Sequence, residues 1–221
     1  MGEMKRVFPM LGWMIAITFM IGVVLRWQIN GWASLGWLAF IISISIIRAP
    51  HSKRNKSNII TEKKSVSVER VLLALVAIGG TFIPLIHLAT GMLSFANYRL
   101  PDWAAIIGFI LIVPTLWLFW RSHTDLGQNW SVTVEAREGH TLITNGVYGR
   151  IRHPMYTAIW MGFLLQPLFV QNWVAGFTGI LSFGLMYLLR VPYEENMMRE
   201  QFGESYEAYC SRTGRLLPKF S

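Results

Sequence analysis

Long apolar segments alternate with short polar ones along this chain. Five segments contain no Asp, Glu, Lys or Arg, and they are Val7–Leu25, Trp27–Ile47, Val71–Tyr98, Trp103–Trp120 and His153–Leu189. A helix that crosses the apolar core of a bilayer needs about 20 apolar residues, so each of the first four segments predicts one transmembrane helix. The fifth segment is long enough for two helices, and the polar pairs Gln166-Pro167 and Gln171-Asn172 predict the break between them.

The continuity of these segments predicts helices instead of β-strands. Strands of a membrane barrel alternate between apolar and polar residues, whereas these segments are apolar throughout. The composition agrees, because only 14% of the residues are charged and 53% are hydrophobic, against roughly 25% charged residues in ordinary globular domains. Pro84 and Pro114 lie inside the third and fourth segments and predict bends, since proline removes a backbone donor.

The distribution of basic residues predicts how the helices are threaded. Six helices place both ends of the chain on one side of the membrane. All but two of the 20 Lys and Arg residues then fall on that side, and the exceptions are Arg26 and Arg99. The positive-inside rule makes the basic side cytoplasmic. The net charge of +8 is therefore explained by an anionic membrane surface, and no nucleic-acid partner is expected.

These patterns together predict an all-α, polytopic membrane protein with about six spans and a cytoplasmic C-terminal cap. We expect one integrated membrane domain. Residues 1–120 form its first four spans, and residues 121–221 form a catalytic region made of a cofactor loop, a helical hairpin of spans five and six and a cytoplasmic tail. The compact size and the basic charge suggest the inner membrane of a bacterium or archaeon.

The first polar cluster of interest precedes the fifth apolar segment and reads Gly146-Val-Tyr-Gly-Arg-Ile-Arg-His-Pro-Met-Tyr156. Proline is at home in the first turn of a helix, so His153-Pro154 predicts the start of the fifth span. His123, His140 and His153 match no metal-ligand spacing, and no HExxH motif is present, so no metal is expected. The sequence also contains neither GxGxxG nor GxSxG, which argues against a Rossmann fold and a serine hydrolase.

The second polar cluster follows the same apolar segment. Arg190 and Glu194 are four residues apart, and on a helix they share one face. One interpretation is an ordinary ion pair at the end of a span. In the functional interpretation, the guanidinium of Arg190 binds a carboxylate or phosphate, and Glu194 accepts from an ammonium group. Farther on, a helical stripe interrupted at Phe202-Gly203 predicts two short helices, and its members are Met198, Phe202, Tyr206 and Tyr209.

Taken together, these motifs resemble the isoprenylcysteine carboxyl methyltransferase family, within the wider set that includes phospholipid N-methyltransferases. The resemblance covers roughly residues 115–221 and agrees in order and spacing. It is carried by His140-Thr-Leu-Ile143, Gly146-Val-Tyr148, Arg152-His-Pro-Met-Tyr156, Arg190 to Glu195, and Phe202-Gly203 with Tyr206, Tyr209 and Pro218.

The resemblance implies a membrane enzyme that uses S-adenosylmethionine in a cytosol-facing pocket and releases S-adenosylhomocysteine. Arg190 matches a substrate-side arginine of the family, and Arg121 lies near another functional arginine. Carried over position by position, the cofactor contacts are His140, Thr141, Leu142, Ile143, Tyr148, His153, Pro154, Met155, Tyr156 and Glu194. The partners implied are the lipid bilayer and a lipophilic or lipidated methyl acceptor.

Two other functions stay open at this point. Membrane reductases of the sterol-reductase type use NADPH and share an Arg-His-Pro motif, but their motif usually continues to a Gly-Asp pair, whereas Tyr156 is followed here by Thr157-Ala-Ile159. A non-enzymatic membrane protein, such as a scaffold or a transporter, is the second alternative. Its spans should carry paired polar residues near the middle of the membrane, and these spans carry almost none.

Overall fold

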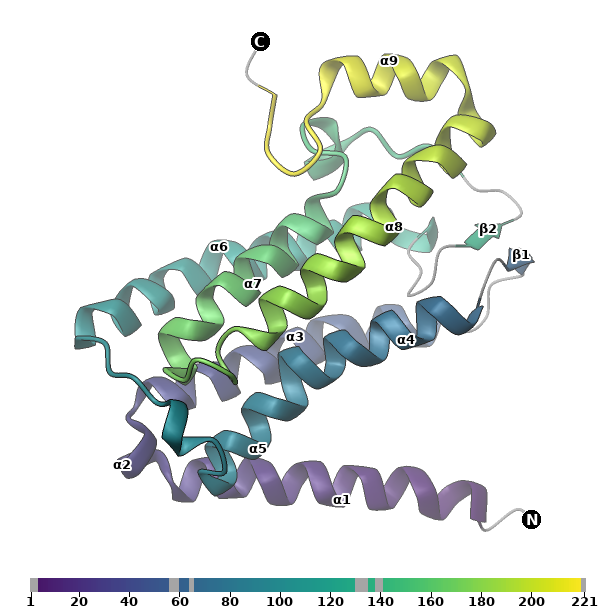
Figure 1. The fold of residues 1–221 in the computed structure, drawn as a ribbon. Helices are drawn as coiled ribbons and strands as arrows, with labels where there is room; N and C mark the ends of the chain where they lie inside the picture. The colour runs from purple at the N-terminus through teal and green to yellow at the C-terminus, as the bar shows by residue number, and fades with distance from the viewer. Residues whose placement is uncertain (1–3, 56–59, 64–65, 130–134, 138–140, 220–221) are drawn as a thin grey trace.

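The structure is a computed structural model that describes residues 4–55, 60–63, 66–129, 135–137 and 141–219. Over these residues the protein is mainly helical, as the apolar segments predict (Figure 1). The helices are α1 Met4–Leu25, α2 Trp27–Asn30, α3 Ala33–Asn55, α4 Val66–Ala77, α5 Ile83–Thr90, α6 Asp102–Leu126, α7 Pro154–Val170, α8 Thr178–Phe202 and α9 Glu204–Arg212. Strands β1 Ile60–Lys63 and β2 Glu135–Arg137 form an antiparallel pair that the sequence patterns did not predict.

The described helices include three that are long and apolar enough to cross a membrane. They are Ala33–Ser52, Val68–Thr90 and Asp102–Leu126. Met14–Leu25 and Pro154–Val170 are shorter apolar helices. Many large apolar side chains on these helices are exposed, including Ile110 and Trp117 of α6, as expected where lipid and not water covers the surface. The protein is therefore an integral membrane protein.

The long helices run between two ends of the molecule (Figure 1). Helix α2, the turn after α5 and the connection between α7 and α8 lie at one end. The beginning of α1, the β1–β2 pair and the loop that leads into α7 lie at the other, and α9 with the C-terminal segment lies beyond the end of α8 (Figure 1). Arg26, which precedes α2, and Arg99, which precedes α6, are at the first end.

A π-helical turn, Ile78–Phe82, interrupts the third predicted span directly before Pro84. The hydroxyl of Thr178, at the start of α8, donates to the carbonyl oxygen of Gly79 within this turn at 2.9 Å. A side chain at Gly80 would overlap the ring of Phe163 on α7. The two glycines therefore let this span pack closely against the α7–α8 hairpin.

The hairpin turn between α7 and α8 is built around Asn172, which is fully buried. Its side-chain amide donates to the carbonyl oxygen of Leu93 at 2.7 Å, and its Oδ1 accepts from the backbone nitrogen of Ala175 at 2.8 Å. Gln171 adopts a left-handed conformation with φ 47° and ends α7. The break predicted at Gln171-Asn172 is confirmed, and it sends α8 back along α7 to the end where the polar clusters lie. The break predicted at Gln166-Pro167 is wrong, because α7 continues through Pro167 to Val170.

Candidate active site

The loop between α6 and α7 is fastened to the end of α6. The Asp125 carboxylate pairs with Arg121 at 2.6 Å and accepts from the backbone nitrogen of Val147 at 2.9 Å. Gly146 precedes this contact with a φ of 57°, and a side chain there would overlap the Asp125 carboxylate. Glycine is the residue that adopts such a conformation without strain. The turn Gly146–Gly149 is therefore fixed, and with it the position of Tyr148.

Tyr148 lies between the loop and the C-terminal helices. Its hydroxyl donates to the carbonyl oxygen of Ser122 at 3.2 Å, and its own carbonyl oxygen accepts from the hydroxyl of Tyr209 on α9 at 2.6 Å. Burial raises the pKa of the Tyr148 phenol, and the neighbouring Tyr209 and Asp125 raise it further. The phenol is therefore neutral, and it joins α6, the loop and α9.

Helix α7 begins as predicted, with His153 as the residue before it and Pro154 in its first turn. The backbone of the C-terminal segment, Thr213–Leu217, holds this start in place. The nitrogens of Arg152 and His153 donate to the carbonyl oxygens of Gly214 at 2.8 Å and Arg215 at 3.0 Å. The His153 side chain is thereby aimed at α8.

Arg190 and Glu194 share one face of α8, because the helix continues through Pro192. Arg190 Nε donates to Glu194 Oε1 at 2.8 Å, and Arg190 Nη1 lies 3.4 Å from the Glu69 carboxylate of α4. The Tyr156 hydroxyl also donates to Glu194 Oε1 at 2.8 Å. His153 Nδ1 lies 3.8 Å from Glu194 Oε2. The two polar clusters of the sequence therefore meet.

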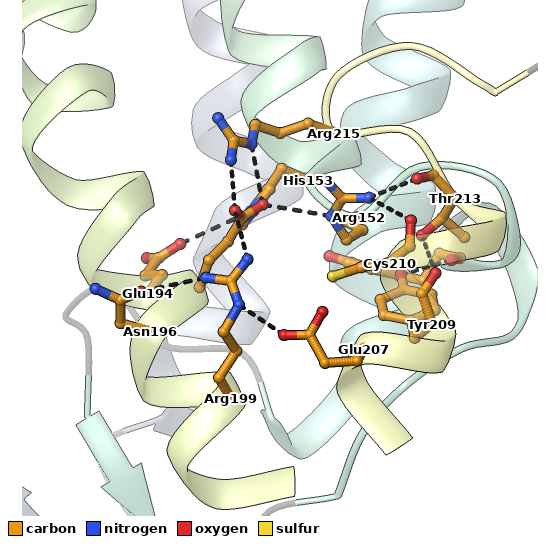
Figure 2. Close-up of polar contacts among 12 residues, drawn as sticks. Arg152, His153, Glu194, Asn196, Arg199, Glu207, Tyr209, Cys210, Thr213 and Arg215 are labelled. Carbon is orange, nitrogen blue, oxygen red and sulfur yellow. Dashed lines mark hydrogen bonds and ion pairs between the residues drawn. The ribbon is translucent and has the colours of Figure 1, made fainter. Parts of the chain in front are cut away.

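Glu195 faces a different set of partners and is 1% exposed. Arg152, His153 and Arg215, which Figure 2 labels, all contact its carboxylate. Arg215 donates to both oxygens, at 3.0 and 2.6 Å, while Arg152 Nε and His153 Nε2 each lie 3.3 Å from Oε1. Burial alone would raise the pKa of Glu195, but the hydrogen bonds from His153 and Arg215 lower it well below its usual value. Glu195 is therefore an ionised carboxylate.

A cavity of about 440 Å³ opens beside these clusters. Apolar side chains form much of its lining, among them Phe40 and Ile44 of α3, Val76 of α4 and Phe183 of α8. The predicted residues that line it are Thr141, Leu142, Ile143, Tyr148, His153, Met155, Tyr156, Arg190 and Glu194. Most of the predicted site residues are thus brought together around one space.

Two of the predicted site residues that the structure describes, Pro154 and Arg121, do not line this cavity. Pro154 is buried and forms the first turn of α7 without lining the cavity. Arg121 also does not line it, since its guanidinium pairs with Asp125 and lies 5.6 Å from the ring centroid of Trp120. His140 lies outside the described residues. Among the described residues no group of three His, Cys, Asp or Glu side chains could hold a metal ion.

The structure adds residues to the site that sequence reasoning did not assign to it. Asn129 lines the cavity, accepts from the Thr141 backbone nitrogen at 3.4 Å and donates to its hydroxyl at 3.1 Å. Arg152 and Tyr206 belong to sequence motifs noted above, and both line the cavity. Glu69 reaches Arg190 from another span, and nothing in the local sequence around Glu69 indicated this contact.

Comparison with known proteins adds independent information. The model of the isoprenylcysteine carboxyl methyltransferase family matches residues 105–200. Protein-S-isoprenylcysteine O-methyltransferase B of Arabidopsis thaliana is 30% identical over 117 residues, which are 51% of this chain and 55% of that protein. Protein-S-isoprenylcysteine O-methyltransferase of Homo sapiens is 23% identical over 208 residues, which are 92% of this chain and 72% of that protein.

A solved structure is also similar. It is that of a eukaryotic intramembrane Ras methyltransferase, isoprenylcysteine carboxyl methyltransferase, and it matches with a TM-score of 0.48 and 18% identity over 83% of this chain and 62% of that chain. The family match includes α7 with His153 and the part of α8 with Arg190 and Glu194. Residues 105–200 therefore carry the sequence pattern of the isoprenylcysteine carboxyl methyltransferase family, the family that the motifs of this chain resemble.

Proposed function

We propose that this chain is an integral membrane methyltransferase that transfers a methyl group from S-adenosylmethionine to a lipophilic acceptor. One observation carries the proposal. His153 and Glu194, about 40 residues apart in the sequence, approach to 3.8 Å and line one cavity that is also lined by many apolar side chains. The two relatives named above are, by their names, O-methyltransferases of protein S-isoprenylcysteine. An isoprenylated cysteine is therefore the first acceptor to test.

The residues of the cavity fit the chemistry of S-adenosylmethionine. Its volume of about 440 Å³ is in the range of small-molecule sites, roughly 300–1,000 Å³. Glu194 offers an anionic oxygen for an ammonium group, and Asn129 and Thr141 offer amide and hydroxyl groups. We assign cofactor contacts to the predicted residues Thr141, Leu142, Ile143, Tyr148, His153, Met155, Tyr156 and Glu194, with His140 as a further contact and Pro154 as the support of this wall.

We place the polar end of the cavity on the cytosolic side. Six spans, formed by α1, α3, α4 with α5, α6, α7 and α8, put both termini there, and the excess of basic residues on that side supports the orientation. Helix α9 and the C-terminal segment then form the cytoplasmic cap. The region from residue 121 onward holds the catalytic residues, and the first four spans supply the membrane-facing wall.

Each residue has a distinct part in the mechanism. When bound, the cofactor supplies a methyl group on a positively charged sulfur. Glu194 fixes the cofactor's ammonium group, and Arg190 orients an anionic group of the acceptor, while Glu69 and Glu194 hold the guanidinium in place. The apolar walls exclude water and take up the acceptor's chain. Such alignment of two reactants contributes roughly 7–11 kcal/mol in favourable cases.

The decisive experiment uses the full chain purified in detergent. It is incubated with S-adenosylmethionine carrying a labelled methyl group and, in separate reactions, an S-farnesyl cysteine derivative, an amine-bearing phospholipid and a small thiol. We expect label in a lipophilic acceptor and saturable binding of S-adenosylhomocysteine. Binding of NADPH without any binding of S-adenosylhomocysteine would instead identify a reductase and end the proposal.

A further inference from the structure

Glu195 is a buried carboxylate that the proposed function does not use. It does not line the cavity, and neither does its closest partner Arg215. A buried carboxylate is costly unless it is paired and hydrogen-bonded. Glu195 meets this condition through Arg152, His153 and Arg215, which come from the loop before α7 and from the C-terminal segment (Figure 2).

The charged groups around Glu195 determine which atom donates the hydrogen in its contact with His153. An arginine side chain can only donate, and two of them point at this carboxylate, so the carboxylate is ionised and can only accept. The hydrogen in the contact between His153 Nε2 and Glu195 Oε1, 3.3 Å long, must then belong to the imidazole. In a neutral imidazole, a hydrogen on Nε2 leaves Nδ1 as an acceptor.

His153 Nδ1 points toward the other carboxylate. It lies 3.8 Å from Glu194 Oε2, which is longer than a hydrogen bond. With the imidazole neutral and its hydrogen on Nε2, two acceptors, His153 Nδ1 and Glu194 Oε2, stand side by side at the wall of the cavity. A group with several N–H donors and a positive charge satisfies both at once, and an ammonium group is the part of the cofactor with this chemistry.

We propose that Glu195 is a positioning residue that holds His153 in its Nε2–H form, so that Nδ1 and Glu194 together bind the cofactor's ammonium group. The inference rests on the proposed function for the identity of the ligand. Glu195 acts through His153 and does not touch the cofactor. Arg215 supports the arrangement because it donates to both Glu195 oxygens from the C-terminal segment.

The tautomer is tested directly on the protein without any ligand. Nitrogen NMR of the full chain labelled at its five histidines distinguishes a protonated from an unprotonated ring nitrogen, and a His153→Asn sample identifies the His153 signals. We expect the proton of His153 on Nε2. A proton on His153 Nδ1, alone or together with one on Nε2, would overturn the inference whether or not the protein is a methyltransferase.

Ligand binding tests the second part. The probes are S-adenosylhomocysteine and 5′-methylthioadenosine, which lacks the amino-acid portion and hence the ammonium group. Glu195→Gln should weaken binding of the first by about tenfold and leave the second unchanged. Arg199→Gln is the matched control, because Arg199 lies 3.9 Å from Glu195 on the exposed side of the cluster and contacts Glu207 and Asn196 instead of His153.

The outcomes separate the two proposals. If the unaltered protein binds neither probe, the proposed function fails, and the NMR result still decides the role of Glu195. If the unaltered protein binds S-adenosylhomocysteine and Glu195→Gln binds it equally well, the positioning role is wrong. An equal loss of both probes in Glu195→Gln contradicts it as well, because that result indicates a collapse of the wall and not the loss of one contact.

Discussion

Replacing Glu194 with glutamine isolates the contact on which the proposed cofactor site depends. Glu194 Oε1 accepts from Arg190 Nε and from the Tyr156 hydroxyl, both at 2.8 Å. The carbonyl oxygen of a glutamine can keep both bonds. The other oxygen, Oε2, faces His153 Nδ1 at 3.8 Å, and it becomes an amide nitrogen that donates instead of accepting. The substitution therefore changes mainly the atom that the ammonium group would meet.

The size of the effect follows from the kind of bond lost. A hydrogen bond to a charged group contributes roughly 1.5–3 kcal/mol, and every 1.4 kcal/mol is about a factor of ten in affinity. We therefore expect Glu194→Gln to weaken S-adenosylhomocysteine binding by about 10- to 150-fold. Titration calorimetry of the detergent-purified protein measures this change. Glu200→Gln on the exposed side of the same helix is the control and should bind as the unaltered protein does.

Binding of 5′-methylthioadenosine shows whether the loss is local. This compound has no ammonium group, so Glu194→Gln should bind it with unchanged affinity. Undiminished binding of S-adenosylhomocysteine by Glu194→Gln would refute the reasoning, because the carboxylate would then have no part in holding the cofactor.

Three further predictions follow from the same geometry. Arg190→Ala should lower the rate of methyl transfer by about 10- to 100-fold, judged from the loss of one charged hydrogen bond, while the affinity for S-adenosylhomocysteine changes less. A normal rate of methyl transfer in this variant would reject the role of Arg190 in orienting the acceptor. Gly146→Ala should destabilise the fold by about 1–3 kcal/mol, since φ is positive there and the new methyl group meets Asp125. Gly149→Ala is the control, because φ is not positive at Gly149, and equal melting temperatures of the two variants would contradict this prediction. The pKa of Glu195 is lowered in the folded protein, so its contribution to stability is present above the ordinary carboxyl pKa and is lost as the pH falls below that value. The melting temperature should therefore fall less steeply with decreasing pH in Glu195→Gln than in the unaltered protein. Parallel curves for the two proteins would show that this carboxylate is not responsible.

The sequence was informative wherever a local rule decides the structure. The start of α7 at His153-Pro154, the turn at Gln171-Asn172 and the interruption at Gly203 all depend on residues that favour helix ends, and all three are found. The contact between Arg190 and Glu194 was also expected, because residues four apart on a helix are neighbours.

The contacts that join distant segments were not predictable in this way. Glu194 and Glu195 are adjacent and chemically equivalent, yet successive helix residues point about 100° apart, and only the placement of α7 and the C-terminal segment decides which partners each one meets. Glu69 reaches Arg190 through the packing of α4 against α8. The β1–β2 pair joins segments on either side of three helices, and strands this short carry little signal of their own.

The hydrogen bonds from Arg152 and His153 to the segment around Gly214 have a consequence for biosynthesis. Arg215 follows α8 in the chain, so the two carboxylates on α8 leave the ribosome before the arginine that neutralises one of them. Until Arg215 has left the ribosome, Glu195 lacks its two strongest donors. The charge of Glu195 is therefore balanced only after the C-terminal segment has closed onto the start of α7.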